Sequence, residues 1–415
     1  MKYLKAFFLG SALLCSAVCM AQTQKKTTHI IGEVNGYRPV SIMLTRVEDE
    51  KRVNESHEIP FRDGQFTFDY TSDKPEVLQL VVYLGDGSGR YTEFFAEGDT
   101  VQVKFYAGEV PEMLSSSPLN KQQQQADEEI YSTLRPLGKK LRKMEKDGLD
   151  MTPEAQQLKK KILEARENNS PDSIILPLIE EARRMDEEGR MYTPEYRETE
   201  KLYGEAYRQS FIDQREYARN HPDPVGLYNL YYAAERCKEG EDKEIIDIYQ
   251  SVFDGKLPDF HLSDYMSIWC ASRQIRVGGT FYDFTAPDPD GNEHRLSEEI
   301  NGKIALIDLW ASWCGPCRRK AKSMIPVYEE YKDKGFTIVG VARENKVDDM
   351  RIALKHDKYP WLNLLELRDR AKIWRHYGAG NAGGKTILVD KDGTILAIEP
   401  DADEVKSILE TKLKQ

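Results

Sequence analysis

The chain has 415 residues, with 59 Lys and Arg against 70 Asp and Glu, so its formal net charge is -11. This charge argues against a nucleic-acid-binding protein, which would concentrate basic residues in one patch. The length allows two or three domains with separate cores. The 31% share of charged residues predicts long, solvated helices.

The first 21 residues have the pattern of a signal peptide. Lys2 and Lys5 precede an apolar stretch over 6–18, and small residues end the segment at Ala21. The apolar stretch is too short to span a bilayer. We therefore expect an exported, periplasmic protein that is cleaved near Ala21.

A lipid anchor on Cys19 is the alternative at this end of the chain. Ser16 and Val18 suit the recognition pattern for acylation poorly. We therefore expect a mature protein without a lipid.

Residues 28–107 consist of short β-rich runs separated by turn signals. The run 65–70 alternates apolar and polar residues, and turns are expected at 86–89 and 97–99. This pattern predicts a small antiparallel β-sandwich. No His, Cys or acidic cluster in it suggests a catalytic site.

The region 119–276 changes to a helical period. Helix-breaking sequences occur at 168–171, 221–224 and 255–258. We interpret the apolar stripes between them as core faces of amphipathic helices. The stripes contain Tyr131, Leu134, Leu137, Leu141 and Met144, then Ile175, Leu178, Ala182 and Met185, then Tyr203, Tyr207 and Phe211, and finally Ile245, Ile248, Tyr249 and Val252. Cys237 and Cys270 in this region are either bridged or free buried thiols.

From residue 278 to the end of the chain, strands and helices alternate. Expected strands are 304–309, 336–341, 361–365, 385–389 and 394–398. Expected helices follow Cys317, cover 348–356 and begin at Asp401. This order predicts an α/β domain with a mixed sheet.

The segment from Trp310 to Cys317 reads Trp-Ala-Ser-Trp-Cys-Gly-Pro-Cys and separates an expected strand from an expected helix. A thiol at a helix N-terminus loses its proton more easily, so Cys314 is the predicted nucleophile. Cys317 lies about one turn later, where we expect it to be less exposed and able to form a disulfide with Cys314. Gly315 permits a tight turn, and Pro316 suits the first helical turn.

The same two cysteines could be half of a zinc site. Such a site needs a second Cys or His pair at ligand spacing. Cys237 and Cys270 stand alone, and no two His residues are close in sequence. We therefore predict no metal and favour redox chemistry.

The motif resembles the active site of the thioredoxin family, in particular the exported TlpA/ResA-like thiol-disulfide oxidoreductases. The resemblance covers about a third of the chain and implies a thioredoxin fold over 278–415. It implies that Asp308 is a buried acid which moves the proton of Cys317, and that Trp313 walls one side of the site. It also implies no cofactor beyond the Cys314–Cys317 disulfide.

The family resemblance further implies a reductase that acts on disulfide-containing envelope proteins and receives electrons from a membrane donor. The segment 28–107 resembles a β-domain of unknown function found at the N-terminus of such proteins. The expected fold class is thus multidomain α+β, with a β-sandwich, a helical region and a thioredoxin-like domain.

The chain departs from the family pattern at two places. Lys320 and Lys322 stand where envelope relatives carry Glu and Pro. Gly383 and Gly384 stand where thioredoxins place a cis-proline that faces the cysteines. Because non-proline cis bonds cost about 2.5 to 4 kcal/mol, we expect a trans loop and slower exchange with generic substrates. On this view a proline at position 384 or 383 would speed exchange.

Two rival functions remain. A peroxidase would carry Thr and Pro before the reactive cysteine, where Ala311 and Ile307 stand. A non-catalytic envelope binding protein would dock a partner on its β and helical domains and use the thioredoxin module as a scaffold or redox-sensitive latch.

Overall fold

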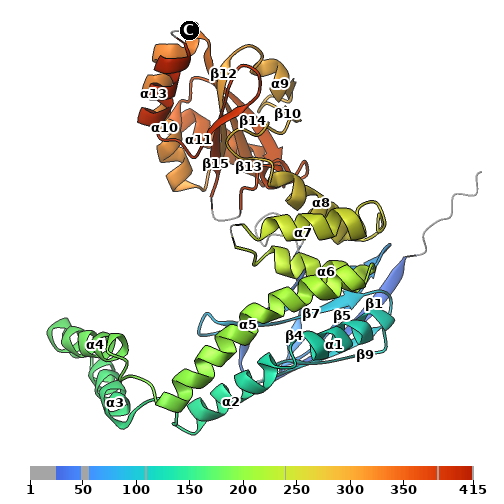
Figure 1. Cartoon of the computed structure of the whole chain (residues 1–415), viewed down its shortest axis with the longest axis vertical. Coiled ribbons are helices and arrows are strands. Elements are labelled where there is room, and N and C mark those ends of the chain that lie inside the picture. The colour runs from blue at the N-terminus through green and yellow to red at the C-terminus, as the bar shows by residue number, and fades with distance from the viewer. Residues whose placement is uncertain (1–24, 48–55, 108–109, 239, 381–382, 414–415) are drawn as a thin grey trace, which may run out of the picture.

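The computed structural model describes residues 25–47, 56–107, 110–238, 240–380 and 383–413 (Figure 1). Two β-sheets are followed by a helical middle and a C-terminal mixed sheet, which confirms the predicted multidomain α+β class. The predicted signal peptide, with Cys19 and Ala21, lies outside the described residues. No helix within these ranges combines the length and apolar character needed to cross a membrane.

The N-terminal sheets are a five-stranded sheet in the order β4-β5-β1-β8-β9 and a four-stranded sheet in the order β3-β2-β6-β7. One core cluster collects side chains from both sheets, for example Ile30 and Phe66 from the first and Leu80 and Phe94 from the second. The strands are β1 (Lys26–Asn35), β2 (Pro39–Arg46), β3 (His57–Glu58), β4 (Phe61–Arg62), β5 (Gln65–Ser72), β6 (Glu76–Leu84), β7 (Gly89–Ala96), β8 (Thr100–Tyr106) and β9 (Glu112–Ser115).

This region differs from the sequence prediction in two ways. Strands β1 and β8 pair in parallel, so the region is not wholly antiparallel. The chain visits the second sheet through β6 and β7 before it returns beside β1, and such a crossover permits a parallel pair. The last strand, β9, pairs with β8 and carries the β-region beyond the expected limit at residue 107.

The helical middle packs on the four-stranded sheet. Its largest core cluster joins Val77 and Phe95 of the sheet to buried side chains of α5 to α8. His261 on α8 accepts a hydrogen bond from the Val77 N–H at 2.8 Å, which fixes this helix on β6. The elements are α1 (Pro118–Ile130), α2 (Leu134–Lys146), α3 (Pro153–Glu167), α4 (Asp172–Glu187), α5 (Pro194–Asn220), α6 (Pro224–Ala234), α7 (Asp242–Ile248), the π-helix η1 (Tyr249–Phe253) and α8 (His261–Ser272).

The helical stripes are only partly core faces. Ile245, Ile248 and Tyr249 are buried as predicted, whereas Tyr207 is 43% exposed. Tyr207 lies on α5, which extends past the body of the molecule toward α3 and α4 (Figure 1), and the prediction was wrong for this residue. Tyr203 of the same stripe packs against the small core of Leu141, Met144 and Tyr196. Cys237 and Cys270 are free and half-buried. Burial raises the pKa of Cys270 to about 12, as expected for an inert thiol.

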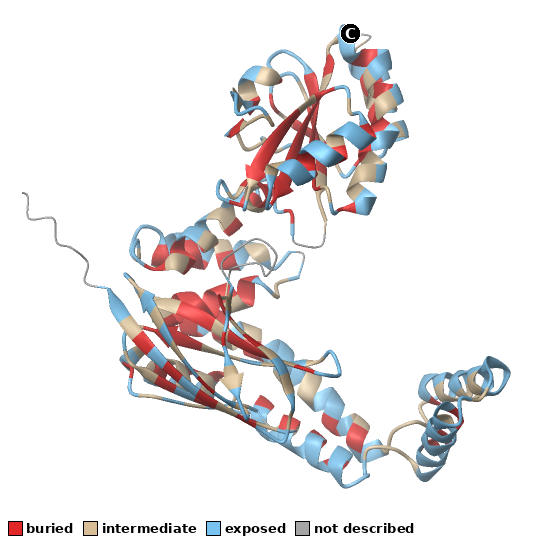
Figure 2. Ribbon diagram, turned by 180° about the vertical axis from the view of Figure 1, so that it is seen from behind, coloured by how far each residue is buried: buried red, intermediate tan, exposed pale blue. Residues whose placement is uncertain are grey.

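Helices α3 and α4 form an arm that is mostly exposed (Figure 2). Its small core contains Ala155, Leu158 and Met185. At its base the Thr152 N–H donates to the Met191 carbonyl at 3.0 Å, and the Thr193 N–H donates to the Asp150 carbonyl at 2.8 Å. The side chains of Thr152 and Thr193 also cap α3 and α5.

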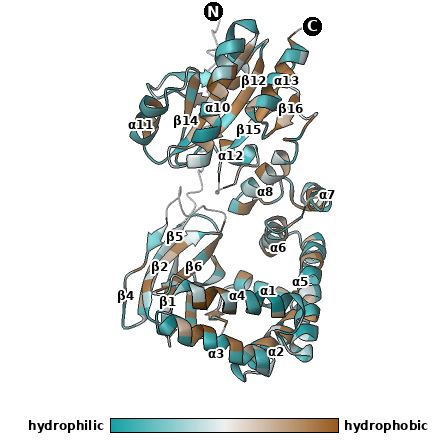
Figure 3. Ribbon diagram, turned by 90° about the vertical axis from the view of Figure 1, so that its left-hand side faces the viewer, coloured by the Kyte–Doolittle hydropathy of each residue, from teal (hydrophilic) through white to brown (hydrophobic). Residues whose placement is uncertain are grey.

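The C-terminal sheet has the order β14-β13-β12-β15-β16. Its central strand β12 is buried at every position, is parallel to β13 and antiparallel to β15. Core clusters cover both faces of this sheet, and hydrophobic residues follow its strands (Figure 3). The elements are β10 (Thr285–Pro287), β11 (Glu293–Arg295), α9 (Leu296–Glu299), β12 (Ile304–Trp310), α10 (Gly315–Tyr331), η2 (Lys332–Lys334), β13 (Phe336–Glu344), α11 (Val347–Asp357), β14 (Leu362–Leu367), α12 (Ile373–His376), β15 (Lys385–Val389), β16 (Ile395–Ile398) and α13 (Ala402–Lys412).

Candidate active site

The two cysteines of the motif lie where β12 gives way to α10. Cys314 is the N-cap residue of α10, and its Sγ accepts the Cys317 N–H at 3.3 Å. Cys314 and Cys317 are joined by a disulfide with a Cα–Cα distance of 5.3 Å. The helix N-terminus therefore directs both a backbone donor and the positive end of its dipole at the Cys314 sulfur.

The relative exposure of the two cysteines is opposite to our expectation. Cys314 is 4% exposed, because its side chain packs into the core cluster that also holds Ala311 and Trp374. Cys317 is half-buried and is thus the more exposed of the pair. Trp374 comes from α12, which lies nearly sixty residues beyond the motif, so the local sequence could not reveal this packing.

Asp308 is buried in the middle of β12 and is 3% exposed. Burial raises the pKa of its carboxyl to about 7, while Lys320 lowers this pKa and Glu399 raises it further. Asp308 lines a cavity of about 160 Å³ that also reaches both cysteines. The residues lining this active-site cavity are Asp308, Leu309, Cys314, Pro316, Cys317, Lys320, Gly383, Gly384, Lys385, Thr386 and Glu399.

Two residues of the active-site cavity, Glu399 and Lys385, were missed by sequence reasoning. The Glu399 carboxylate lies 2.8 Å from the Lys320 ammonium and accepts the Thr386 N–H. Lys385 donates to the Tyr377 carbonyl at 2.9 Å, and burial lowers the pKa of its ammonium. Glu399 follows β16, so only the pairing of β16 with β15 brings it to the cysteines. No local motif marks either residue.

Charged side chains hold the turn before α10 in place. Glu344 accepts hydrogen bonds from the backbone N–H and the hydroxyl of Ser312. Arg318 donates to the Ser312 carbonyl at 3.0 Å and makes two bonds to Asp357, at 2.6 and 3.0 Å. Lys322, one of the departures from the family pattern, lies 2.7 Å from the Asp357 carboxylate.

Asp357 is therefore the buried acceptor for two cations of α10. Burial alone would raise the pKa of its carboxyl, but the hydrogen bonds from Arg318 and Lys322 outweigh burial and hold this pKa well below its usual range. The Asp357 carboxylate thus ties the active-site helix to the end of α11.

The loop at Gly383 and Gly384 closes the other side of the active-site cavity. The Gly384 N–H donates to the Cys317 Sγ at 3.1 Å. The described part of the chain contains no cis peptide bond, which agrees with the trans loop expected at 383–384. A Cβ atom on Gly384 would lie 1.7 Å from the Leu309 carbonyl oxygen, whereas a Cβ on Gly383 meets nothing within 4 Å. The trans loop therefore has no room for proline at position 384.

The remaining predicted contact residues form an outer rim. Trp313 is 42% exposed, and its ring centroid lies 6.4 Å from that of the buried Trp374. Gly315 and Pro316 are exposed at the start of α10. A disulfide of another protein could approach the cysteines over these three residues. Within the described ranges, no group of three or more His, Cys, Asp or Glu side chains is arranged to hold a metal ion.

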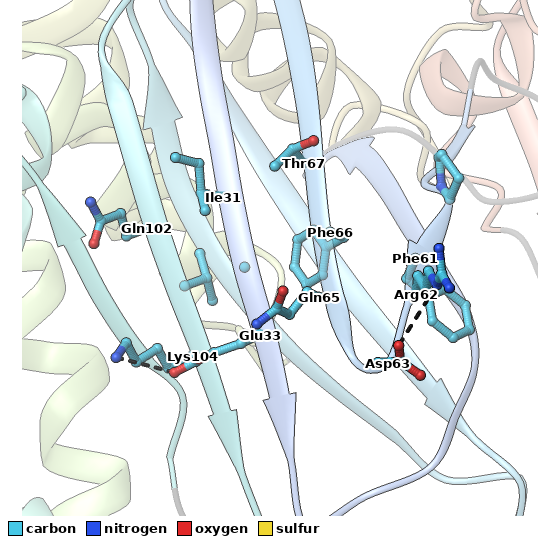
Figure 4. Close-up of a pocket in the computed structure, with 13 residues that line it drawn as sticks. Ile31, Glu33, Phe61, Arg62, Asp63, Gln65, Phe66, Thr67, Gln102 and Lys104 are labelled. Atoms are coloured by element: carbon cyan, nitrogen blue, oxygen red, sulfur yellow. Dashed lines mark ion pairs between the residues drawn. The ribbon is translucent and has the colours of Figure 1, made fainter.

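A larger cavity, of about 630 Å³, lies on the five-stranded N-terminal sheet (Figure 4). Its charged side chains pair with one another, Lys104 with Glu33 at 3.1 Å and Arg62 with Asp63 at 3.7 Å. Its lining residues include no cysteine. The smaller cavity beside Cys314 and Cys317 is therefore the candidate active site.

The fold and this dithiol define a thioredoxin-like domain. Residues 277–398 match the family described as "AhpC/TSA family". The chain is 28% identical over 135 residues to "Thiol-disulfide oxidoreductase ResA" of Geobacillus thermodenitrificans, and the match covers 32% of this chain and 75% of that protein. The protein of the same name from Bacillus anthracis is 26% identical to this chain over 153 residues. That match covers 36% of this chain and 84% of the relative.

Among solved structures, the chain is similar to the thioredoxin domain of a thiol-disulfide oxidoreductase from Bacteroides vulgatus. That domain is 31% identical to the matching part of this chain. The match covers 33% of this chain and 96% of the solved domain, with a TM-score of 0.31. The C-terminal domain is therefore similar to the AhpC/TSA family and to curated thiol-disulfide oxidoreductases.

Proposed function

We propose that the protein is an envelope thiol-disulfide oxidoreductase that reduces protein or small-molecule disulfides through Cys314 and Cys317, with no other cofactor. The main support is the position of Cys314 as the N-cap of α10, where its sulfur accepts the Cys317 N–H. Hydrogen bonds to a sulfur at a helix N-terminus favour its thiolate, which is the nucleophile of disulfide exchange.

In the proposed reaction the Cys314 thiolate attacks one sulfur of a substrate disulfide. That disulfide breaks, the leaving sulfur takes the electron pair and a proton, and a mixed disulfide with Cys314 remains. Asp308 then accepts the proton of Cys317, either directly or through water in the active-site cavity. The Cys317 thiolate attacks the Cys314 sulfur, releases the second substrate thiolate and forms the Cys314–Cys317 disulfide. Substrate and protein thus exchange two electrons.

Asp308 suits the role of proton acceptor for two reasons. It lines the same cavity as Cys317. Its carboxyl has a pKa of about 7, and an acid–base group works best when its pKa lies near the operating pH. The exposed Trp313, Gly315 and Pro316, together with the loop at Gly383 and Gly384, would form the substrate-contacting rim.

The predicted signal peptide supports a periplasmic location, and disulfide substrates persist in that compartment. Continued reduction needs an electron source, which we propose to be a membrane protein dithiol. Redox titration of the Cys314–Cys317 couple tests the enzyme against the binding-protein alternative. A potential in the range of exchange catalysts favours the enzyme, whereas a very reducing one indicates a structural bridge and favours the binding protein.

Trapping of substrates tests the residue roles. Cys317→Ser should accumulate mixed disulfides through Cys314, and Cys314→Ser should not. Non-reducing gels of exported protein give the measurement, and the Cys314→Ser/Cys317→Ser double variant is the control for unrelated crosslinks. Equal trapping by both single variants would show that Cys314 is not the sole nucleophile.

A further inference from the structure

The two active-site sulfurs each accept a hydrogen bond from a different backbone N–H. The Cys314 Sγ accepts the N–H of Cys317 from α10, at 3.3 Å. The Cys317 Sγ accepts the N–H of Gly384, at 3.1 Å. Gly384 immediately precedes β15, so the second donor comes from the loop that leads into the sheet and not from the active-site helix.

The close approach of Gly384 to Cys317 requires glycine for reasons of space. A Cβ atom at position 384 would lie 1.7 Å from the Leu309 carbonyl oxygen and 3.2 Å from the Cys317 sulfur. Gly384 is not among the glycines with positive φ, so backbone conformation does not explain the residue. Gly383 has open space where its Cβ would be. The constraint is therefore specific to Gly384.

The residue type at this position decides whether a donor exists. Thioredoxins, which this domain resembles, carry a proline in the place of Gly383 or Gly384, and proline has no backbone N–H. A hydrogen bond donated to a sulfur stabilises its charged form more than its neutral form. Glycine at position 384 therefore gives Cys317 a donor that a proline could not supply.

We propose that Gly384 is a positioning residue whose backbone N–H holds the Cys317 sulfur and stabilises it as a thiolate for the resolving step. The proposal rests on the proposed dithiol function. In that step the Cys317 thiolate attacks Cys314, the bond between Cys314 and the substrate breaks, and the substrate sulfur leaves with the electron pair. A larger thiolate fraction of Cys317 at neutral pH makes this step faster.

Two substitutions at position 384 take the N–H away from Cys317 in different ways. Gly384→Ala and Gly384→Pro both add a Cβ, but only the proline removes the N–H. In the Cys314→Ser background Cys317 is the single active-site thiol, and its ionisation can be followed by thiolate absorbance against pH. We expect both substitutions to raise the pKa of Cys317 by about one unit above its value with Gly384, because the added Cβ must move the N–H away from the sulfur in Gly384→Ala and the N–H is absent in Gly384→Pro.

The two substitutions at position 384 should also change the rate at which Cys317 attacks the mixed disulfide on Cys314. With both cysteines present, release of a peptide from a preformed mixed disulfide on Cys314 should be about threefold slower in either variant than with Gly384 at neutral pH. A pKa one unit higher lowers the thiolate fraction about tenfold, while it raises the nucleophilicity of the thiolate about threefold. This is opposite to the gain expected from the sequence alone. Gly383→Ala is the matched control, and the pKa of Cys317 should not change in it. A Cys317 pKa in folded Gly384→Pro equal to that with Gly384 would overturn the proposal.

A second measurement needs no substitution at Gly384. In the folded Cys314→Ser protein, the Gly384 amide proton resonance should shift with the ionisation of Cys317, and the Gly383 amide should shift much less. A Gly384 resonance that stays fixed through the titration would rule out the hydrogen bond even if the substituted variants do not fold. If substrate trapping by Cys317→Ser succeeds and this resonance does not move, the oxidoreductase function stands and only the role of Gly384 fails. If trapping fails and the resonance moves, the hydrogen bond from Gly384 stands and the oxidoreductase function fails.

Discussion

The ammonium of Lys320 lies 2.8 Å from the carboxylate of Glu399, and both residues line the cavity that contains Asp308. The two partners act on Asp308 in opposite directions. Burial is the main cause of its raised pKa, Lys320 lowers that pKa, and Glu399 raises it. An ion pair from two distant parts of the chain thus tunes the proposed proton acceptor.

Substitution of either partner should shift the pKa of Asp308 in a direction set by the charge removed. Lys320→Met should raise it above about 7, and Glu399→Gln should lower it. The carboxyl carbon resonance of Asp308 against pH gives the measurement. Lys322→Met is a control on the same helix, because Lys322 pairs with Asp357 instead. Shifts of the same sign in the Lys320 and Glu399 variants would contradict this electrostatic account.

Asp308→Asn should stabilise the fold at high pH and impair catalysis. The folded pKa of the Asp308 carboxyl, about 7, lies above its ordinary value of 3.8, so the ionised carboxyl destabilises the folded state as pH rises through this window. The gain from Asn should reach roughly 4 kcal/mol above pH 7 and vanish below about pH 4. Urea unfolding of the oxidised proteins at pH 8 and pH 4 measures it. A gain that is equal at both pH values would show that ionisation is not its cause.

Asp357→Asn should have the opposite effect on stability. The pKa of the Asp357 carboxyl is held below its ordinary value of 3.8, so the folded carboxylate contributes stability above that pH and this stability is lost progressively as pH falls further. We expect a loss on the order of 2 kcal/mol at pH 7 that shrinks below about pH 4. Asp348→Asn on the same helix is the control, because that acid is exposed and its pair with Arg351 should contribute little. A comparable loss in both variants would argue against a special role for Asp357.

The mature protein should begin at Gln22 and carry no lipid. The reason is the poor acylation context of Cys19 together with the small residues before Gln22. Intact-mass measurement of the exported protein tests this. A diacylglyceryl mass on Cys19 would instead tether the oxidoreductase to a membrane.

Much of the candidate site was predictable because its signals are local. The strand, the two-cysteine turn and the helix are adjacent in sequence, and Asp308 is recognisable as an acid inside an apolar run. Glu399, Asp357 and the Gly384 donor were not predictable in these roles. Each reaches the site only through strand register or helix packing, at 40 to 82 residues beyond Cys317. The parallel β1–β8 pair was missed for the same reason, since sequence alternation shows a strand but not its neighbour or direction.

The arm of α3 and α4 leaves and re-enters the molecule at one point, because Thr152 and Thr193 are both held at its base. Its small core belongs to the arm and to the segments at that base. A change in arm length would therefore not alter the path of the rest of the chain. Related proteins could gain, shorten or lose the arm as a unit while the dithiol stays in place. Length differences at 153–187 among homologues should accordingly be uncorrelated with changes around Cys314 and Cys317.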